Sequence, residues 1–344
     1  MGRAEAAGAV PSGVLLPEDA GPPLRPPNRA APRPGPPPEL QGHPMPILSD
    51  NVRGAFFMVM SMSAFTLNDA FMKALGEEVP LFQAVFLRSI AVVALLAFLS
   101  WRKDGLRLPS DPRDLKLVVI RSVAEAAAAY FFITALFNMP IANVTAILQS
   151  LPLTITLTAA VLFREPLGWR RLTAIFIGFC GVLLIVQPGG DGFSIYSLYV
   201  LGAVACVTVR DLATRRLSRA IPSMSVALAA AVAVLVFSGV ASIFVDWVPL
   251  RGDRGLQLGG AVLFVVAAYL TSVMAMRVGE VAFVAPFRYT GLLVAILLGV
   301  LFFGETPGPL VLTGSALIAA TGIFTLWRER RFARRRMPVM QRLR

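Results

Sequence analysis

Long apolar stretches alternate with short polar joints from about residue 52 to about residue 327. Each stretch has about 20 residues, the length that a helix needs to cross the hydrocarbon core of a bilayer. The joints carry Gly, Pro or charged residues, as in EEVP (77–80) and GETPGP (304–309). The pattern therefore predicts ten transmembrane helices, over residues 52–75, 80–101, 115–138, 141–163, 168–187, 194–213, 222–246, 257–276, 281–303 and 309–327.

The composition also favours a lipid environment. Apolar residues make up 56% of the 344 residues and charged residues 15%, and the mean hydropathy is +0.70. Soluble globular chains have about 45–50% apolar and about 25% charged residues. Because the bilayer core holds no water, backbone groups there must pair within helices. The sequence predicts an all-α membrane protein.

Residues 1–49 differ from the rest, because they hold half of the 26 prolines and have no apolar periodicity. Such a segment cannot bury enough surface to offset its ordering entropy, so we expect a disordered Pro-rich tail. A Pro-rich ligand for a partner domain is the alternative. Met45 is an alternative start of translation.

Basic residues gather at alternate joints. One set of joints and the C-terminal tail carry most of them, whereas the opposite joints carry only Lys73, Arg251 and Arg254. By the positive-inside rule, both termini are expected in the cytoplasm. The net charge of +12 is then topological, and we expect no nucleic-acid partner. Residues 329–344 are expected to form a basic cytoplasmic tail next to anionic lipid.

Weak internal similarity divides the helical region in two. Asp69 and Pro80 recur 142 positions later as Asp211 and Pro222, and Glu165 recurs 140 positions later as Glu305. Five helices precede the copy and five is odd, so the second copy must be inverted in the membrane. We predict two inverted five-helix repeats, residues 50–190 and 191–328, an architecture common among secondary carriers.

The fourth and fifth helices of each half carry a recurring element. It reads AILQSLPLTITLTAAVLFREPLGWRRLTAIFIGFCGVLLI at 146–185 and APFRYTGLLVAILLGVLFFGETPGPLVLTGSALIAATGIF at 285–324. With the ten helices, this element makes residues 52–327 resemble the EamA-type carriers of the drug/metabolite transporter superfamily. Family members usually show Gly-Glu at the end of the fourth helix. The second copy keeps Gly304-Glu305, whereas the first has Arg164-Glu165.

VRDLATRR (209–216) and FRYTG (287–291) resemble a bacterial branch of this family that includes riboflavin and S-adenosylmethionine carriers. The resemblance implies a plasma-membrane carrier that performs no chemistry on its substrate. We expect secondary active or facilitative transport by alternating access of the two repeats. The expected substrate is a small organic metabolite: a riboflavin-like vitamin, a nucleoside-type compound such as S-adenosylmethionine, or an amino-acid-like metabolite.

Three ionisable residues lie deep in expected helices, where charges are costly and tend to mark transport pathways. They are Arg88, Glu125 and Arg288. We hypothesise that Glu125 pairs with one arginine and that the other meets an anionic or electron-rich group of the substrate. A purely structural ion network is the alternative, as is a local pair between Arg121 and Glu125, one helical turn apart.

Asp69 and its repeat partner Asp211 are candidates for gating or coupling, one near each end of the bundle. The alternatives are a solvated pair of Asp69 with Lys73 and a local pair of Asp211 with a flanking arginine. The only histidine lies in the N-terminal tail. Proton coupling, if present, therefore falls to Glu125, Asp69 or Asp211.

Pro152 and Pro286 are expected to kink the fourth and ninth helices, because proline lacks a backbone donor. Such breaks expose backbone polar groups to a cavity in carriers, and a kink that serves packing alone is the alternative. Two groups of side chains near the expected cavity follow as candidates: hydrogen-bonding side chains at Gln149 and Tyr289, and aromatic rings for stacking at Tyr130 and Tyr289. Small residues recur every four positions along the ninth helix and favour close helix packing, with a homodimer contact as the alternative. They are Gly291, Ala295 and Gly299.

Several classes of function are excluded by absence. Two cysteines and one histidine are too few for a multi-cysteine or His-rich metal site, and no G-x-x-x-x-G-K-[ST] segment indicates an ATP-driven pump. We expect no metal, no cofactor, no catalytic residue and no enzyme activity. The expected partners are a small-molecule substrate and the lipid bilayer. A membrane scaffold or receptor and a membrane-embedded lipid enzyme are the alternatives.

The basic residues comprise 29 arginines and 3 lysines. This bias indicates a GC-rich bacterial genome, so we expect the bacterial inner membrane.

Overall fold

The computed structural model describes residues 50–103, 111–164, 168–190, 192–218, 221–278 and 281–340. The chain divides into two units, Met1–Met45 and Pro46–Arg344, and the described residues all belong to the second. Among them, nine helices are long and apolar enough to cross a membrane, and a tenth has the shorter apolar segment Pro309–Thr325. The expected all-α membrane fold is confirmed, whereas the expected N-terminal tail lies outside the described residues.

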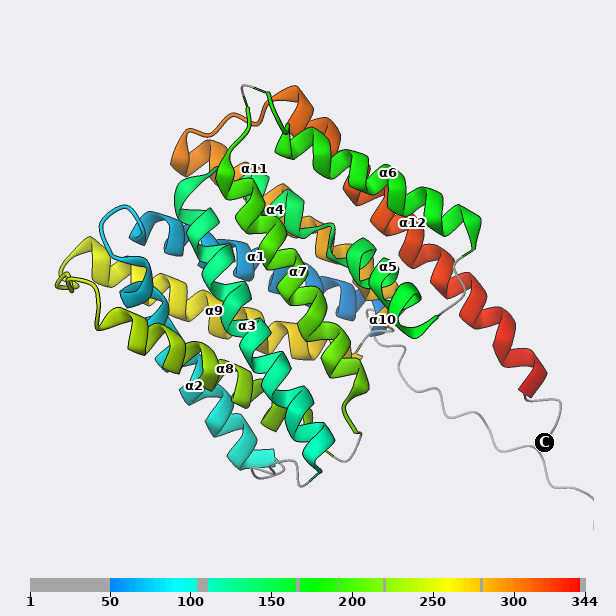
Figure 1. Cartoon of the computed structure of the whole chain (residues 1–344), viewed down its shortest axis with the longest axis horizontal. Coiled ribbons are helices and arrows are strands. Elements are labelled where there is room, and N and C mark those ends of the chain that lie inside the picture. Colours follow the sequence, from blue (N-terminus) through cyan, green and yellow to red (C-terminus); the bar gives the residue numbers. More distant parts are fainter. Residues whose placement is uncertain are drawn as a thin grey trace, which may run out of the picture. The chain divides into compact units, whose positions relative to one another are not determined.

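The helices follow the expected order along the chain (Figure 1). They are α1 (Asp50–Leu75), α2 (Leu81–Lys103), α3 (Pro112–Asn138), α4 (Ile141–Leu148), α5 (Leu151–Phe163), α6 (Trp169–Val186), α7 (Ile195–Arg216), α8 (Ser223–Ser242), α9 (Asp253–Val278), α10 (Val281–Val284), the 3₁₀ turn η1 (Ala285–Tyr289), α11 (Thr290–Phe303) and α12 (Pro309–Met340).

Helix ends follow local sequence signals. The Asp111 side chain accepts a hydrogen bond from the Arg113 backbone N–H at 2.9 Å and caps α3, which has proline at its first position. Helices α5 and α11 both end in the left-handed region, at Arg164 (φ 52°) and at Gly304 (φ 62°). The first repeat thus keeps the same turn although arginine replaces the usual glycine. Glu165 lies outside the described residues.

The fourth and ninth transmembrane segments are interrupted, as the prolines predict. Gln149 and Ser150 separate α4 from α5, and η1 separates α10 from α11. Pro152 stands in the first turn of α5, and Pro286 lies in η1. Gln149 lies two residues before α5 begins, Tyr289 lies directly before α11, and the two are 140 positions apart. The two breaks therefore occupy equivalent places in the two repeats.

The packing of the helices has the symmetry of an inverted repeat. The most extensive contacts join α1 to α9 and α3 to α7, two pairings that the repeat exchanges with each other. Helices α6 and α12, and α2 and α8, each pair with their own repeat partner. In Figure 1, α6 and α12 lie side by side at the upper right, and α2 and α8 at the lower left. The ten spans thus form two interlocked five-helix repeats.

Glycines allow the closest helix approach, between α6 and α12. A Cβ atom built on Gly181 would lie 2.7 Å from the carbonyl oxygen of Gly314. The small-residue stripe of α11 is also used within the chain. Ala295 is fully buried, Gly291 faces Thr66 of α1, and Gly299 lies against Ile141 of α4. This stripe therefore packs inside the protein and offers no surface to a second copy.

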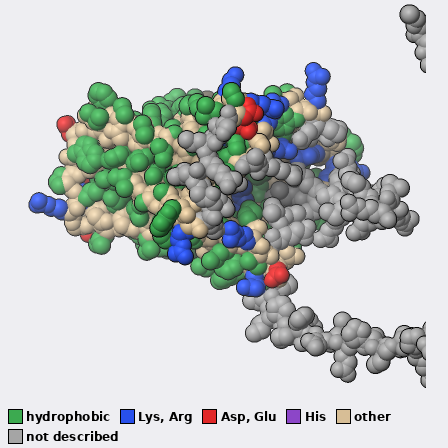
Figure 2. Space-filling model, turned by 90° about the horizontal axis from the view of Figure 1, so that it is seen from below, with side chains coloured by type: hydrophobic (Ala, Val, Ile, Leu, Met, Phe, Trp, Pro, Cys, Tyr) green, Lys and Arg blue, Asp and Glu red, His purple; other side chains and the backbone are tan. Residues whose placement is uncertain are grey.

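Large apolar side chains point outward along the bundle. Phe244 is 83% exposed, Trp101 76% and Phe302 73%. Figure 2 shows hydrophobic side chains over the broad middle of the visible face, with Lys and Arg gathered mainly towards its right-hand part. A surface of this kind is matched to lipid, since exposed apolar area of this extent would drive aggregation in water.

Candidate functional site

The helices alternate in direction, so the bundle has two distinct ends. At one end, here called the terminal end, α1 begins and α7 finishes at Arg216; the opposite end holds the connections after α1, α3 and α8. A cavity of about 580 Å³ lies among α1, α2, α3, α4, α7, α8 and α9. Its charged lining residues are Asp69, Arg88, Arg121, Glu125, Arg210, Asp211 and Arg288.

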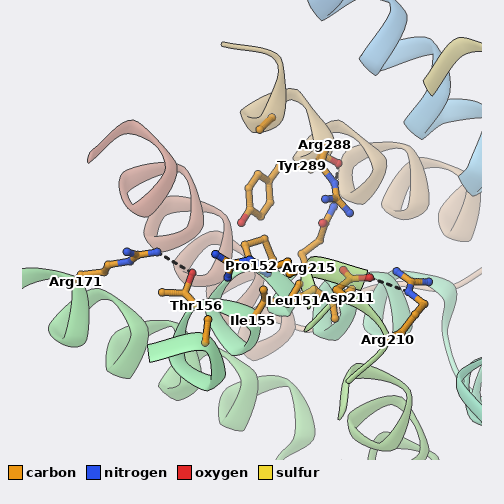
Figure 3. A pocket seen from close by; sticks show the side chains of 13 residues that line it. Leu151, Pro152, Ile155, Thr156, Arg171, Arg210, Asp211, Arg215, Arg288 and Tyr289 are labelled. Carbon is orange, nitrogen blue, oxygen red and sulfur yellow. Dashed lines mark hydrogen bonds and ion pairs between the residues drawn. The ribbon is translucent and has the colours of Figure 1, made fainter. Parts of the chain in front are cut away.

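A second pocket, of about 350 Å³, continues the cavity towards the terminal end. The two share Gln149, Arg210, Asp211 and Arg288 among their lining residues. Figure 3 shows Arg288 and Tyr289, from η1, facing Arg210 and Asp211 of α7 across this pocket. Arg171 also lines it and donates a hydrogen bond to the Thr156 hydroxyl at 3.1 Å. The cavity therefore reaches the terminal end through the broken helices.

Arg210 is the centre of an ion network in the cavity. Its Nη1 lies 3.3 and 3.2 Å from the two carboxylate oxygens of Glu125, and its Nε donates to Asp211 at 2.8 Å. The Arg210 and Glu125 side chains are each 26% exposed, so this contact is shielded from bulk water. The hypothesis that Glu125 pairs with Arg88 or Arg288 is wrong here, because α7 brings Arg210 closer to it.

Arg121 does not pair with Glu125 either, although they lie one turn apart on α3. Its Nε donates to the Thr214 hydroxyl at 2.9 Å, and its Nη1 donates to the carbonyl oxygen of Val226 at 3.0 Å. Arg121 thus joins α3 to α7 and α8. Its role in this conformation is to tie helices together at the rim of the cavity.

Within the described part of the chain, neither Arg88 nor Arg288 forms a direct ion pair with a carboxylate, although the charge of Asp69 attracts Arg88. The Arg88 Nε atom is buried and has no hydrogen-bond partner there. Gln149 does contact the Arg288 residue, but through its backbone, donating to the Arg288 carbonyl oxygen at 3.1 Å. Both guanidinium groups line the cavity, so both are available to a ligand.

Asp69 and Asp211 occupy matching positions in the two repeats and make matching contacts. Each carboxylate accepts a hydrogen bond from the preceding side chain, Asn68 at 2.9 Å and Arg210 at 2.8 Å. The interpretation of Asp69 as a partner of Lys73 is wrong, because Asp69 faces the cavity whereas Lys73 turns to the opposite end. Asp211 does form the predicted local pair.

The two candidate tyrosines, Tyr289 and Tyr130, lie in different places relative to the cavity. Tyr289 lines the second pocket but is only 7% exposed, and its hydroxyl packs on Gly322 of α12 without a hydrogen-bond partner in the described residues. Tyr130 lines neither pocket. It lies in an aromatic cluster outside the cavity, with its ring stacked on Phe82 at 6.0 Å and close to Phe237 and Tyr199. Its side chain turns away because successive positions of α3 face different helices.

The opposite end is closed by a cluster that we call the latch, formed by Lys73, Phe303 and Glu305. Lys73 Nζ lies 3.1 Å from a Glu305 oxygen, and both side chains are 13% exposed. Lys73 also donates to the Met139 carbonyl oxygen at 2.7 Å, and Glu305 accepts the Ile141 backbone N–H at 2.9 Å. Glu305 therefore caps the start of α4 and also neutralises a largely buried lysine.

Sequence reasoning assigned no role to the latch or to Arg210 as the central cation. A signal for both was available in the repeat. Asn68 and Arg210 are 142 positions apart, as are Lys73 and Arg215. The ring contacts repeat too, since Lys73 lies 5.5 Å from the Phe303 ring centroid and Arg215 lies 5.7 Å from that of Phe163.

A charged central cavity, flanked by two broken helices in inverted repeats and closed at one end, defines the class of membrane carriers. Comparisons with known proteins agree. Residues 52–187 match the EamA-like transporter family. The chain is therefore a membrane transporter, and its residues 52–187 are similar to the EamA-like family, in line with the resemblance found in its sequence.

Relatives of similar length carry transporter names. A riboflavin transporter of Vibrio cholerae is 26% identical over 72% of this chain and 83% of its own. One of Rhizobium johnstonii is 25% identical over 83% and 94%. An S-adenosylmethionine uptake transporter of Rickettsia conorii is 21% identical over 84% and 97%. A solved structure, 21% identical with a TM-score of 0.56 over 80% of this chain and 97% of its own, shares the fold.

Proposed function

We propose that this transporter moves a small organic metabolite through the central cavity by alternating access of residues 50–190 against residues 191–328. The observation that carries the proposal is the cavity itself, which is shut at the opposite end by the latch and reaches the terminal end. A carrier must close one side before it opens the other. This conformation has the form expected of one half of that cycle.

Side chains on the cavity wall are the proposed substrate contacts. Arg88, Gln149 and Arg288 line it and offer hydrogen-bond donors. We place Glu125, Asp69 and Asp211 in the gating or coupling machinery, since their charges must be balanced whenever the helices move. Tyr289 is proposed to support the break between α10 and α11. Tyr130 is proposed to pack α3 against its neighbouring helices.

The substrate candidates are a riboflavin-like vitamin, a nucleoside-type compound such as S-adenosylmethionine, and an amino-acid-like metabolite. Support comes from the relatives named as riboflavin and S-adenosylmethionine transporters. A cavity of about 580 Å³ falls within the roughly 300–1,000 Å³ of small-molecule sites.

We further propose a bacterial inner-membrane location with the terminal end in the cytoplasm, on the strength of the arginine-rich joints at that end. The cavity would then be open to the cytoplasm. No reaction on the substrate, no cofactor and no nucleic-acid partner are part of this proposal. Self-association remains a hypothesis, to be checked by the mass of the detergent-solubilised protein.

Counterflow in liposomes tests the function. The purified chain is reconstituted with unlabelled riboflavin, S-adenosylmethionine or an amino-acid mixture inside, and entry of the labelled compound is followed. We expect accumulation of one class, lost in vesicles without protein. Vesicles in which no compound exchanges, although the protein is folded, would contradict the proposed substrates.

A single cysteine introduced at Gly252 tests the orientation. Gly252 lies in the connection at the opposite end, and a Cβ atom there would meet nothing within 4 Å. The residue has φ 61°, so substitution strains the turn and the folded yield must be checked. The variant is made in a protein from which the native Cys180 and Cys206 have been removed. In intact cells that express it, a membrane-impermeant reagent should label the cysteine at position 252. Labelling only after lysis would reverse the proposed orientation.

A further inference from the structure

Charge accounting in the cavity singles out one arginine. The wall carries four arginines and three carboxylates among its described residues. Two of the carboxylates, Glu125 and Asp211, share the single cation Arg210. Arg121 donates hydrogen bonds to a hydroxyl and a carbonyl group of neighbouring helices. Arg88 and Arg288 are left over.

The state of Arg88 is costly unless something else occupies the cavity. A guanidinium group has five donors, yet within the described chain Arg88 makes no hydrogen bond or ion pair, and its Nε is buried. Burying a charge without a partner is strongly unfavourable. Asp69 lines the same cavity and its negative charge attracts Arg88, but its carboxylate lies beyond ion-pair distance and accepts from Asn68.

Resting on the proposed transport function, we infer that the substrate carries an oxyanion, a carboxylate or a phosphate, that binds Arg88 and is drawn in by Arg288. Arginine suits this group because its planar fork holds two oxygens at once. Arg288 lines both the cavity and the pocket that continues to the terminal end, so it lies on the path to Arg88.

The inference orders the substrate candidates. Neutral riboflavin offers no oxyanion, whereas S-adenosylmethionine and amino-acid-like metabolites each carry a carboxylate, and a phosphorylated vitamin carries a phosphate. The carboxylate or phosphate group would place a negative charge beside Arg88, on a wall that carries a surplus of one cation. It would also accept hydrogen bonds from Arg88, whose Nε has no acceptor within the described part of the chain.

Matched ligand pairs test the inference on the full-length protein. Thermal stabilisation is measured with riboflavin and riboflavin 5′-phosphate, with S-adenosylmethionine and its decarboxylated form, and with phosphate and acetate alone. A ligand that binds only the folded state raises the melting temperature by mass action. In the riboflavin or the S-adenosylmethionine pair, we expect the member that carries the phosphate or carboxylate to bind about tenfold or more tightly than the member that lacks it.

Variants then assign the contact. Arg88→Gln should lower affinity for the anionic member about tenfold or more and bring it close to that of the partner compound. Arg113→Gln, on the exposed start of α3 and outside both pockets, is the matched control and should change nothing. Arg88→Lys, which keeps the charge but loses the fork, should recover part of the affinity.

Three results would overturn the inference: equal binding within every pair, anion binding that survives Arg88→Gln, and silence of all anionic probes with a folded protein. None of them would remove the proposed transport function. Counterflow of a neutral substrate such as riboflavin would sustain it and show that Arg88 is structural. Anion binding without counterflow would instead keep the site and contradict transport.

Discussion

At the scale of single residues, Arg210 holds together charges that come from two helices. It reaches Glu125 on α3 and Asp211 beside it on α7, so its removal leaves two carboxylates in a shielded place without their cation. We expect Arg210→Gln to lower the free energy of unfolding by about 1–3 kcal/mol, the range for losing a charged hydrogen bond. The melting temperature in detergent measures it.

The matched control for Arg210 is Arg53→Gln. Arg53 pairs with Asp50 at 3.7 Å, and the two side chains are 50% and 72% exposed. Exposed pairs contribute only about 0–1 kcal/mol, so little change is expected. Equal effects of the two substitutions would show that the ion network in the cavity contributes nothing special to stability.

Gly322 of α12 gives a second prediction at this scale. A Cβ atom at this position would overlap the hydroxyl of Tyr289, so Gly322→Ala must push η1 away. We expect a loss of about 1–3 kcal/mol, as in overpacked cores, and a lower transport rate. Thermal unfolding and counterflow measure the two effects.

Two further variants test whether the clash with the Tyr289 hydroxyl causes the loss of stability in Gly322→Ala. Adding Tyr289→Phe removes the hydroxyl and should recover part of the loss. Gly259→Ala in α9, where a Cβ atom meets nothing within 4 Å, should be neutral or slightly stabilising. A Gly322→Ala protein as stable as the parent would mean that η1 yields easily.

At the scale of helices, the latch decides which end of the bundle is closed. Lys73 belongs to α1 and Glu305 follows α11, and the groups that they bond lie at the end of α3 and at the start of α4. A buried apolar cluster that includes Met72, Leu75 and Ala295 lies beneath them. The opposite end cannot open until these contacts separate.

Weakening the latch should therefore favour the conformation in which the opposite end is open. The reporter is an Ala295→Cys substitution in a protein without Cys180 and Cys206. When Lys73→Gln is added, this cysteine is expected to react about fivefold to tenfold faster with a membrane-impermeant reagent. A tenfold change corresponds to a shift of about 1.4 kcal/mol in the equilibrium between the two states. The rate of labelling in intact cells is the measurement.

Arg254→Gln provides the control at the same end. Arg254 pairs with Glu78, and the side chains are 33% and 56% exposed. This pair lies on the surface, so its loss should leave the labelling of Ala295→Cys unchanged. A similar increase for both variants, or none for Lys73→Gln, would show that the apolar cluster alone keeps this end shut.

At the scale of the whole molecule, the chain divides into the units Met1–Met45 and Pro46–Arg344, and the described helices belong to the second. A chain that starts at Met45 is expected to keep the melting temperature and the counterflow rate of the full-length protein, because every helix of the described residues and both pockets lie beyond it. Loss of folding in the shortened chain would give the N-terminal segment a structural role.

Much of the fold could be read along the chain, but the contacts of the site could not. Gln149 and Arg288 reach the cavity as expected, because helix breaks show in the sequence as prolines. Tyr130 does not, since the face of α3 that it occupies depends on how α2, α7 and α8 pack around that helix. The partner of Glu125 was missed because it lies 85 positions away.

The sequence by itself determined the number of spans, the breaks and the inverted repeat. These follow from local hydrophobicity, from proline chemistry and from the parity of five helices, none of which needs a neighbour in space. Only the tertiary structure decided which charges cancel. That Arg210 neutralises Glu125, that Lys73 closes one end with Glu305, and that Arg88 remains for a ligand depends on distances between helices far apart in the chain.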